Sequence, residues 1–278
     1  MRKLLVVSLL FLFQVVVAQS VPYGYNESAG KYFDVGNSTS LYYEIYGTGT
    51  PLLILHGGVF GYIDEFEYLI PKLSEKYQVI CLATRGHVKS DIGNEPYTYE
   101  QRASDAYKLI KHLKLQKVTV IGFSDGGFAA YKLAAIYPDV VDKMVVMGAG
   151  DDPQKEAPGN SSYSAQNLMK EYPDYFRKRV ANMPEPDRWN ESLKMLNDLY
   201  NKSFVSEETF KKIKCPVLVM SGDQDEYSDP QECLAAHQFL PDSRLSIIPG
   251  CGHVILYCNF PAAWESMKMF LGFTNESE

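Results

Sequence analysis

The sequence predicts an α/β protein with a mostly parallel central sheet, helices on both faces of the sheet, and a helical lid inserted after the sixth strand. Short apolar runs alternate with longer helix-like stretches, and this alternation is typical of a parallel sheet covered by helices. The alternation breaks once, between Gly150 and Cys215, which predicts the insertion. One sizeable hydrophobic core is expected, since 46% of the 278 residues are hydrophobic.

Strands are expected where apolar, β-branched and aromatic residues gather between turn residues. Residues 31–35 and 41–46 are strand-like with no helix between them, so they should form an antiparallel edge. The strands of the alternating units follow at residues 52–55, 77–82, 118–121, 144–147, 217–220 and 245–248. The helices between and after them are expected at residues 65–76, 99–113, 124–137, 230–239 and 261–270.

The interruption of this pattern, residues 151–213, has helical periodicity, several prolines and no convincing strand. A structureless loop of that length would be unusual in a compact domain. We interpret it as a helical lid that divides the core into residues 19–150 and 214–278. It should lie over the carboxyl ends of the strands, where open α/β sheets bind ligands. A packing appendage without a substrate role is the alternative, and the point of insertion favours the lid.

The first 18 residues have the pattern of a signal peptide. Arg2 and Lys3 precede an apolar stretch at residues 4–17, and the small residue Ala18 ends it. A membrane anchor would need about 20 apolar residues, so we expect cleavage after Ala18, export to a secreted or periplasmic location, and no stable membrane insertion of the mature chain.

Charge and cysteine content restrict the partners. A net charge of -7 without a run of basic residues argues against electrostatic binding to the phosphate backbone of nucleic acids. The histidines and the five cysteines lack metal-ligand spacing, so neither a metal nor a cofactor is expected. Cys81 and Cys215 fall in or beside apolar strands and should be buried thiols. Cys233, Cys251 and Cys258 are able to supply one disulfide in an oxidising compartment, and its existence and pairing stay open at this point.

Asparagines in N-x-S/T triplets are candidate glycan sites if the chain passes through a eukaryotic secretory pathway. They are Asn26, Asn37, Asn160, Asn190, Asn201 and Asn275.

The strongest chemical signal is Gly122-Phe123-Ser124-Asp125-Gly126, which directly follows a predicted strand and opens a predicted helix. Glycines on both sides permit a tight strand-to-helix turn that presents the Ser124 hydroxyl above the sheet. This G-x-S-x-G in its required context predicts Ser124 as a nucleophile.

A serine hydroxyl needs a base and a group that orients the base. His253 is the predicted base, because its glycine-rich loop follows the last strand and leaves the sheet at the same edge as Ser124. Asp225 is the predicted orienting acid. Asp223 is more typical of a turn former and Asp229 of a helix N-cap before Pro230. The chain order serine, aspartate, histidine fits this architecture.

The loop His56-Gly57-Gly58-Val59 follows the strand at residues 52–55 and predicts an oxyanion hole. Its glycines let backbone amides approach the substrate. We expect the Gly58 amide, with Val59 as the alternative, and the Asp125 amide as donors. His56 is expected to hold this loop by hydrogen bonding.

These motifs, together with Arg85-Gly86-His87-Val88-Lys89-Ser90, resemble the α/β-hydrolase fold family over residues 31–271. Val88 departs from the pattern, because relatives carry glycine there. Gly-Phe-Ser-Asp-Gly-Gly resembles the valacyclovir hydrolase branch of serine esterases. That resemblance implies that the Asp125 carboxylate receives the amino group of an α-amino ester. A first-turn acid favoured by the helix dipole and facing away from the pocket is the alternative.

The sequence therefore predicts a serine hydrolase of small carboxylic esters, including α-amino acid esters, that acts through an acyl-enzyme. Cleavage of carbon–carbon bonds, lactones or N-terminal peptide residues on the same triad stays open, as does a ligand-binding protein on this scaffold. The oligomeric state stays open too. Some aromatic and apolar lid residues should wall the pocket; the candidates are Tyr163, Leu168, Met169, Tyr172, Tyr175, Phe176, Trp189, Met195, Leu196 and Tyr200.

Overall fold

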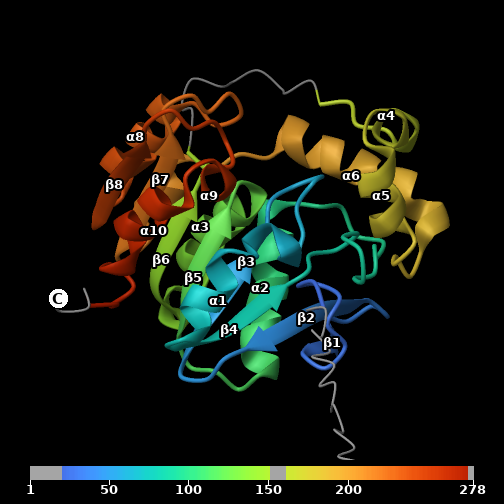
Figure 1. Ribbon diagram of the computed structural model, residues 1–278, viewed down its shortest axis with the longest axis horizontal. Helices are drawn as coiled ribbons and strands as arrows, with labels where there is room; N and C mark the ends of the chain where they lie inside the picture. Colours follow the sequence, from blue (N-terminus) through green and yellow to red (C-terminus); the bar gives the residue numbers. More distant parts are fainter. Residues whose placement is uncertain (1–20, 151–160, 275–278) are drawn as a thin grey trace, which may run out of the picture.

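The computed structural model describes residues 21–150 and 161–274 and is built on one eight-stranded sheet with the order β1-β2-β4-β3-β5-β6-β7-β8 (Figure 1). β2 pairs antiparallel with β1 and β4, and the other pairs are parallel. The predicted antiparallel edge and parallel centre are therefore confirmed. The strands are β1 (Gly30–Asp34), β2 (Ser40–Tyr46), β3 (Thr50–Leu55), β4 (Tyr77–Leu82), β5 (Val118–Phe123), β6 (Val141–Met147), β7 (Val217–Gly222) and β8 (Ser243–Ile248).

Two hydrophobic cores lie on opposite faces of this sheet. Successive side chains of a strand point to opposite faces, and in β3 Leu53 and Leu55 belong to one core while Leu52 and Ile54 belong to the other. The first core also contains buried residues of α2 (Tyr99–His112), α3 (Asp125–Ile136) and α8 (Pro230–Phe239). The second contains residues of α1 (Leu69–Ser74), α9 (Ile255–Cys258) and α10 (Phe260–Lys268).

The predicted helices agree with the structure to within two residues at each end, except the one expected at residues 65–76. The helix expected at residues 65–76 is a short 3₁₀ turn, η1 (Ile63–Phe66), followed by α1. A helix from residue 65 would place Pro71 in its interior, where its missing N–H and its ring break the helical hydrogen bonds. The last helix begins at Phe260, because the Asn259 side chain accepts a hydrogen bond from the Ala262 amide and caps it.

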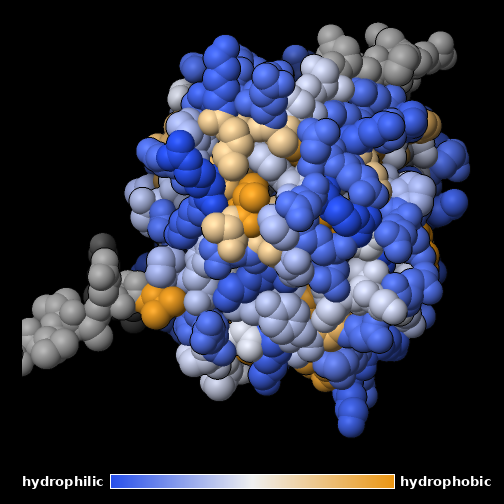
Figure 2. Space-filling view, turned by 90° about the vertical axis from the view of Figure 1, so that its right-hand side faces the viewer, coloured by the Kyte–Doolittle hydropathy of each residue, from blue (hydrophilic) through white to orange (hydrophobic). Residues whose placement is uncertain are grey.

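In the interrupted region, the described residues 161–213 form helices and contain no strand. These helices are α4 (Ala165–Glu171), α5 (Pro173–Val180), the 3₁₀ turn η3 (Pro186–Arg188), α6 (Trp189–Lys202) and α7 (Glu207–Phe210). Figure 1 shows α4, α5 and α6 grouped outside the layers that flank the sheet, and we call these three the lid helices. On the face in Figure 2, hydrophilic side chains surround a small apolar area.

The predicted signal peptide, residues 1–18, and the triplets at Asn160 and Asn275 lie outside the described residues. Within residues 21–150 and 161–274, no helix is long and apolar enough to cross a membrane.

Candidate active site

Ser124 sits at the sharp turn between β5 and α3. Its backbone has φ +51° and ψ −119°, a left-handed conformation that costs about 1–3 kcal/mol in a residue other than glycine. The glycines beside it are required by close packing. A Cβ on Gly126 would lie 2.0 Å from the Leu55 carbonyl oxygen, and one on Gly122 would lie 2.4 Å from the Gly126 carbonyl oxygen. The turn thus holds the serine hydroxyl above the ends of β3 and β5.

Ser124, His253 and Asp225 form one chain of hydrogen bonds. His253 Nε2 lies 3.0 Å from Ser124 Oγ, and His253 Nδ1 lies 2.9 Å from each Asp225 oxygen. A carboxylate only accepts hydrogen bonds, so the ring proton is on Nδ1 and Nε2 is free to accept the serine proton. The Asp225 carboxylate is fully buried, and its Oδ1 also accepts from the amides of Tyr227 and Ser228.

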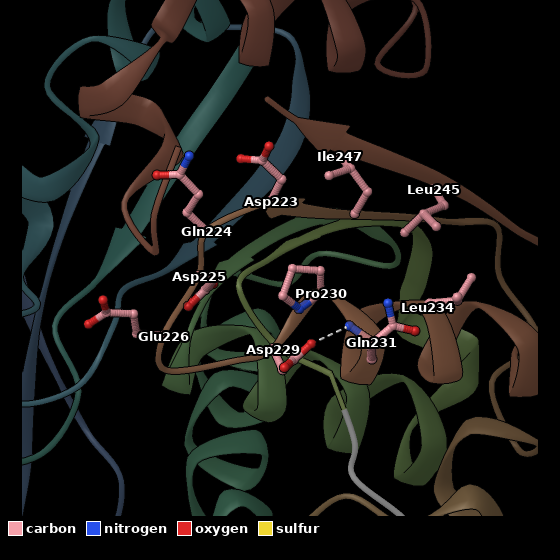
Figure 3. Close-up of a pocket in the computed structure, with 10 residues that line it drawn as sticks. All are labelled: Asp223, Gln224, Asp225, Glu226, Asp229, Pro230, Gln231, Leu234, Leu245 and Ile247. Carbon is pink, nitrogen blue, oxygen red and sulfur yellow. Dashed lines mark hydrogen bonds between the residues drawn. The ribbon is translucent and has the colours of Figure 1, made fainter. Parts of the chain in front are cut away.

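The other two acids considered for this position have different contacts. Asp229 caps α8 by accepting from the Gln231 amide, as predicted (Figure 3). Asp223 accepts from the Gly250 amide, so it bonds the neighbouring loop and not its own turn. Asp223, Asp225 and Asp229 line a hollow of about 790 Å³ beside β8, and neither Ser124 nor His253 borders it (Figure 3). The hollow in Figure 3 is therefore not the candidate active site, which lies on the side of Asp225 that faces His253 and Ser124.

The loop after β3 is held by three side chains. The Gly57 amide donates to Glu65 Oε2 at 2.8 Å, the Gly57 carbonyl oxygen lies 2.8 Å from His56 Nδ1, and the Gly58 carbonyl oxygen lies 3.2 Å from His87 Nε2. In the part of the chain that the structure describes, neither the Gly58 amide nor the Asp125 amide has an acceptor. Both predicted donors are therefore available to an oxyanion.

Two buried histidines support this loop in the neutral form. The Thr84 amide donates to His56 Nε2, so His56 Nδ1 carries the proton and donates to Gly57, in agreement with its predicted role. Burial and the neighbouring His87 hold the pKa of His56 well below its usual value. Burial and the nearby Arg102 lower the pKa of His87 to about 3.

The Asp125 carboxylate lies at the pocket wall but is already paired. Its Oδ2 accepts from the Tyr200 hydroxyl of α6 at 2.8 Å and lies 3.1 Å from Arg102 Nη1. A Cβ on Gly58 would lie 2.7 Å from the same oxygen, so the carboxylate is beside the oxyanion loop. Arg102 was not singled out from the sequence, and Tyr200 was expected only as a possible wall of the pocket, because their contacts with Asp125 arise from the tertiary arrangement of α2 and α6 around it.

Glu65 is a second acid of the pocket that the sequence analysis missed. Glu65 lines the pocket that Ser124 also lines, and its side chain is half-buried. Burial raises the pKa of Glu65 to about 8, with the Gly57 amide acting in the opposite direction. Glu65 is therefore largely protonated at neutral pH.

The pocket above Ser124 has a volume of about 450 Å³. Ser124, His253 and Gly58 line it, and so do Tyr163 and Tyr200 from the predicted lid, together with Phe204. Other lid candidates have structural contacts instead: Leu168, Phe176 and Trp189 are buried, and Tyr172, Tyr175 and Phe176 pack around the Phe60 ring.

Val88, the departure from the family pattern, keeps the backbone that a glycine would favour. Its φ is +50°, and its side chain is buried in the second core. A β-branched residue in this conformation is strained, so Val88 adopts a positive φ at the position where the family pattern has glycine.

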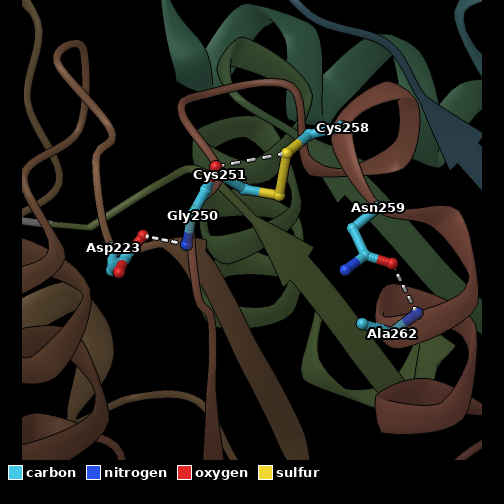
Figure 4. The surroundings of a disulfide bond; sticks show 6 residues. All are labelled: Asp223, Gly250, Cys251, Cys258, Asn259 and Ala262. Atoms are coloured by element: carbon cyan, nitrogen blue, oxygen red, sulfur yellow. Dashed lines mark hydrogen bonds between the residues drawn. A yellow bond between two sulfur atoms is a disulfide. The ribbon is translucent and has the colours of Figure 1, made fainter.

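The disulfide joins Cys251 and Cys258 (Figure 4). Cys81, Cys215 and Cys233 are free and buried, as expected for the first two.

Comparisons with known proteins agree with this architecture. The family model for the alpha/beta hydrolase fold matches residues 50–185 and 157–259. Serine hydrolase BPHL of Homo sapiens is 26% identical over 233 residues, which is 78% of each chain. The AB hydrolase superfamily protein YisY of Bacillus subtilis is 24% identical over 82% of this chain and 94% of its own.

Solved structures show the same fold. An esterase from Exiguobacterium antarcticum matches with a TM-score of 0.70 and 24% identity, covering 87% of this chain and 99% of that one. A serine hydrolase involved in carbazole degradation matches with a TM-score of 0.73 and 20% identity, covering 87% and 98%. With the sheet order, the strained serine turn and the family match in agreement, this chain belongs to the α/β-hydrolase fold family of enzymes.

Proposed function

We propose that this enzyme is a serine hydrolase that cleaves small carboxylic esters. The observation that carries the proposal is the continuous hydrogen-bond chain from Asp225 through His253 to Ser124, which ends at a residue that lines a pocket. Each proposed role follows from the atom that the group presents: a hydroxyl nucleophile, an unprotonated Nε2 and a buried carboxylate.

The reaction has two halves. His253 Nε2 takes the Ser124 proton while Ser124 Oγ attacks the ester carbonyl, and the Gly58 and Asp125 amides stabilise the oxyanion. The imidazolium then protonates the departing alcohol, which leaves an acyl-enzyme. A water molecule deprotonated by His253 attacks the acyl carbon and releases the acid.

The ester class follows from the charges around the pocket. The resemblance implied an α-amino ester whose ammonium group binds Asp125, but Arg102 already pairs with that carboxylate. A substrate ammonium would share one buried carboxylate with a guanidinium, and the two like charges would repel each other. We therefore propose esters without a free amine as the preferred substrates.

The test compares kcat/KM for a free-amine aminoacyl ester with that for its N-acetylated twin, with Ser124→Ala as the control. We expect Ser124-dependent turnover of both, with the N-acetylated ester preferred by up to about tenfold, because it brings no second cation to the Arg102–Asp125 pair. A strong preference for the free amine would restore Asp125 as the ammonium site. No Ser124-dependent turnover would point to another bond type or to ligand binding.

We also propose that the mature enzyme is exported and begins at Gln19. The Cys251–Cys258 disulfide supports this proposal, because disulfides persist in oxidising compartments. N-terminal sequencing of the protein recovered from the host tests it, and an intact Met1 on active, folded protein would contradict it.

A further inference from the structure

The segment that carries His253 is held differently from the segments that carry its two partners. Ser124 is fixed by the β5–α3 turn, and Asp225 by the amides of Tyr227 and Ser228. His253 lies in the loop that joins the end of β8 to α9. The helix α9 is a single turn of four residues. The position of His253 therefore depends on how both ends of this loop are anchored.

The N-terminal end of the loop is tied to the segment after β7. The Gln224 amide donates to the Cys251 carbonyl at 2.9 Å, and the Gly250 amide donates to Asp223 at 2.7 Å (Figure 4). A Cβ on Gly222 would lie 2.1 Å from the Cys251 carbonyl oxygen, so the two loops are in close contact. Cys251 is thus fixed relative to the segment that also carries Asp225.

The C-terminal end of the loop is α9. Ile255 and Leu256 are buried, while Tyr257 and Cys258 are exposed. The Tyr257 and Cys258 amides donate to the Val254 carbonyl, so these bonds close the turn on itself and do not reach the anchored end. The disulfide makes that connection, because it joins Cys258 to Cys251 across a separation of seven residues, with His253 inside the ring.

We propose that the Cys251–Cys258 disulfide is a positioning element for His253, so that a thiol reductant lowers turnover without weakening substrate binding. The inference rests on the proposed hydrolase function. Hydrogen-bonded catalytic groups tolerate little displacement, since an error of about 1 Å can cost on the order of a hundredfold in rate. Of the described residues that line the pocket, His253 and Val254 lie inside the ring and all the others lie outside it, so we expect KM to stay unchanged.

The redox step is an ordinary thiol–disulfide exchange. A dithiol such as dithiothreitol supplies two electrons and two protons; the Cys251–Cys258 bond breaks to give two thiols, and one disulfide forms in the reductant. Exposure of Cys258 gives the reductant access. The three free cysteines should not attack this disulfide themselves, because exchange requires a thiolate. Burial raises the pKa of Cys215 and of Cys233 to about 11 and raises that of Cys81 as well.

The experiment measures kcat and KM of the folded mature enzyme for one neutral ester, before and after reduction, with thiol titration to count the thiols. We expect kcat to fall at least about threefold with KM unchanged, and reoxidation to restore it. The double variant Cys251→Ala/Cys258→Ala should match the reduced enzyme and no longer respond to dithiothreitol. Cys215→Ala, which removes a buried free thiol instead, should respond like the wild type.

An unchanged kcat after both thiols have been titrated would overturn the proposal. So would global unfolding by circular dichroism at the assay temperature, because the role would then be general stability. If the double variant does not fold, the reduced wild type still decides. If the oxidised enzyme lacks Ser124-dependent turnover, the proposed function fails, but the positioning role can still be tested. The NMR resonances of the His253 imidazole must then change on reduction, and unchanged resonances would overturn the positioning role.

Discussion

The buried ion pair between Arg102 and Asp125 allows a direct test of how much charge pairing at the site contributes to the stability of the fold. Arg102→Met removes the guanidinium but keeps much of the side-chain length, and it leaves the Asp125 carboxylate inside the protein. Arg102 is 3% and Asp125 6% exposed, with 3.1 Å between Nη1 and Oδ2. The Tyr200 hydroxyl would be the remaining donor to that oxygen among the described residues.

The size of the effect follows from that burial. Breaking a buried pair on one side costs about 3–5 kcal/mol, because a charge remains without its partner. The bond from Tyr200 persists, so we expect the lower end, about 3 kcal/mol. For a domain of this size each kcal/mol corresponds to roughly 2–4 °C, which predicts a fall in Tm of about 6–12 °C. The double variant Arg102→Met/Asp125→Asn should recover most of the loss.

The assay is urea unfolding followed by circular dichroism. Arg177→Met is the matched control, because Arg177 pairs with Asp174 at the surface, where ion pairs contribute about 1 kcal/mol or less. A loss below 1 kcal/mol for Arg102→Met, or a double variant no more stable than the single one, would refute the reasoning. Arg102→Met should also raise the preference for a free-amine ester, since it leaves Asp125 as an uncompensated acid.

Two further predictions concern the serine turn and the second acid. Gly126→Ala should abolish activity and destabilise the fold, because its Cβ would lie 2.0 Å from the Leu55 carbonyl oxygen; soluble, fully active protein would contradict this. For Glu65, the folded pKa of about 8 lies above its ordinary value of 4.5. The folded state therefore holds a proton that the unfolded state releases, and the wild type loses stability as pH rises from about 4.5 to about 8. Glu65→Gln does not titrate, so unfolding titrations at pH 5 and pH 8 should show its stability rising relative to wild type, and a constant difference would contradict the prediction.

The fold was predictable because its signals are local. Alternating apolar runs and helical stretches locate every strand of the sheet, and the loop after each strand places its residues at a common edge. Ser124, Asp225 and His253 could be selected for the same reason, since each follows the end of a different parallel strand. Prolines and caps, such as Pro71 and Asn259, set helix ends that periodicity alone misplaced.

The missing parts of the site depend on contacts between distant elements. Arg102 reaches Asp125 from α2, and the Tyr200 hydroxyl, expected only as part of a pocket wall, reaches it from α6. Glu65 reaches Gly57 from a 3₁₀ turn predicted as α-helix. The sequence limited a possible disulfide to three cysteines. Its pairing could not be predicted, because it depends on which two cysteines the fold brings together, and these are Cys251 and Cys258. Val88 shows the reverse case: the sequence identified an unusual residue, and the backbone there keeps a positive φ despite the strain.

Trapping of the acyl-enzyme tests the central claim most directly. The mature wild type and Ser124→Ala are mixed with a chromogenic neutral ester, turnover is recorded, and the quenched protein is mapped by peptide mass spectrometry. The account predicts an acyl group on Ser124 and a loss of kcat of at least about a thousandfold in the variant. Comparable turnover by Ser124→Ala, or an acyl group on another residue, would contradict it.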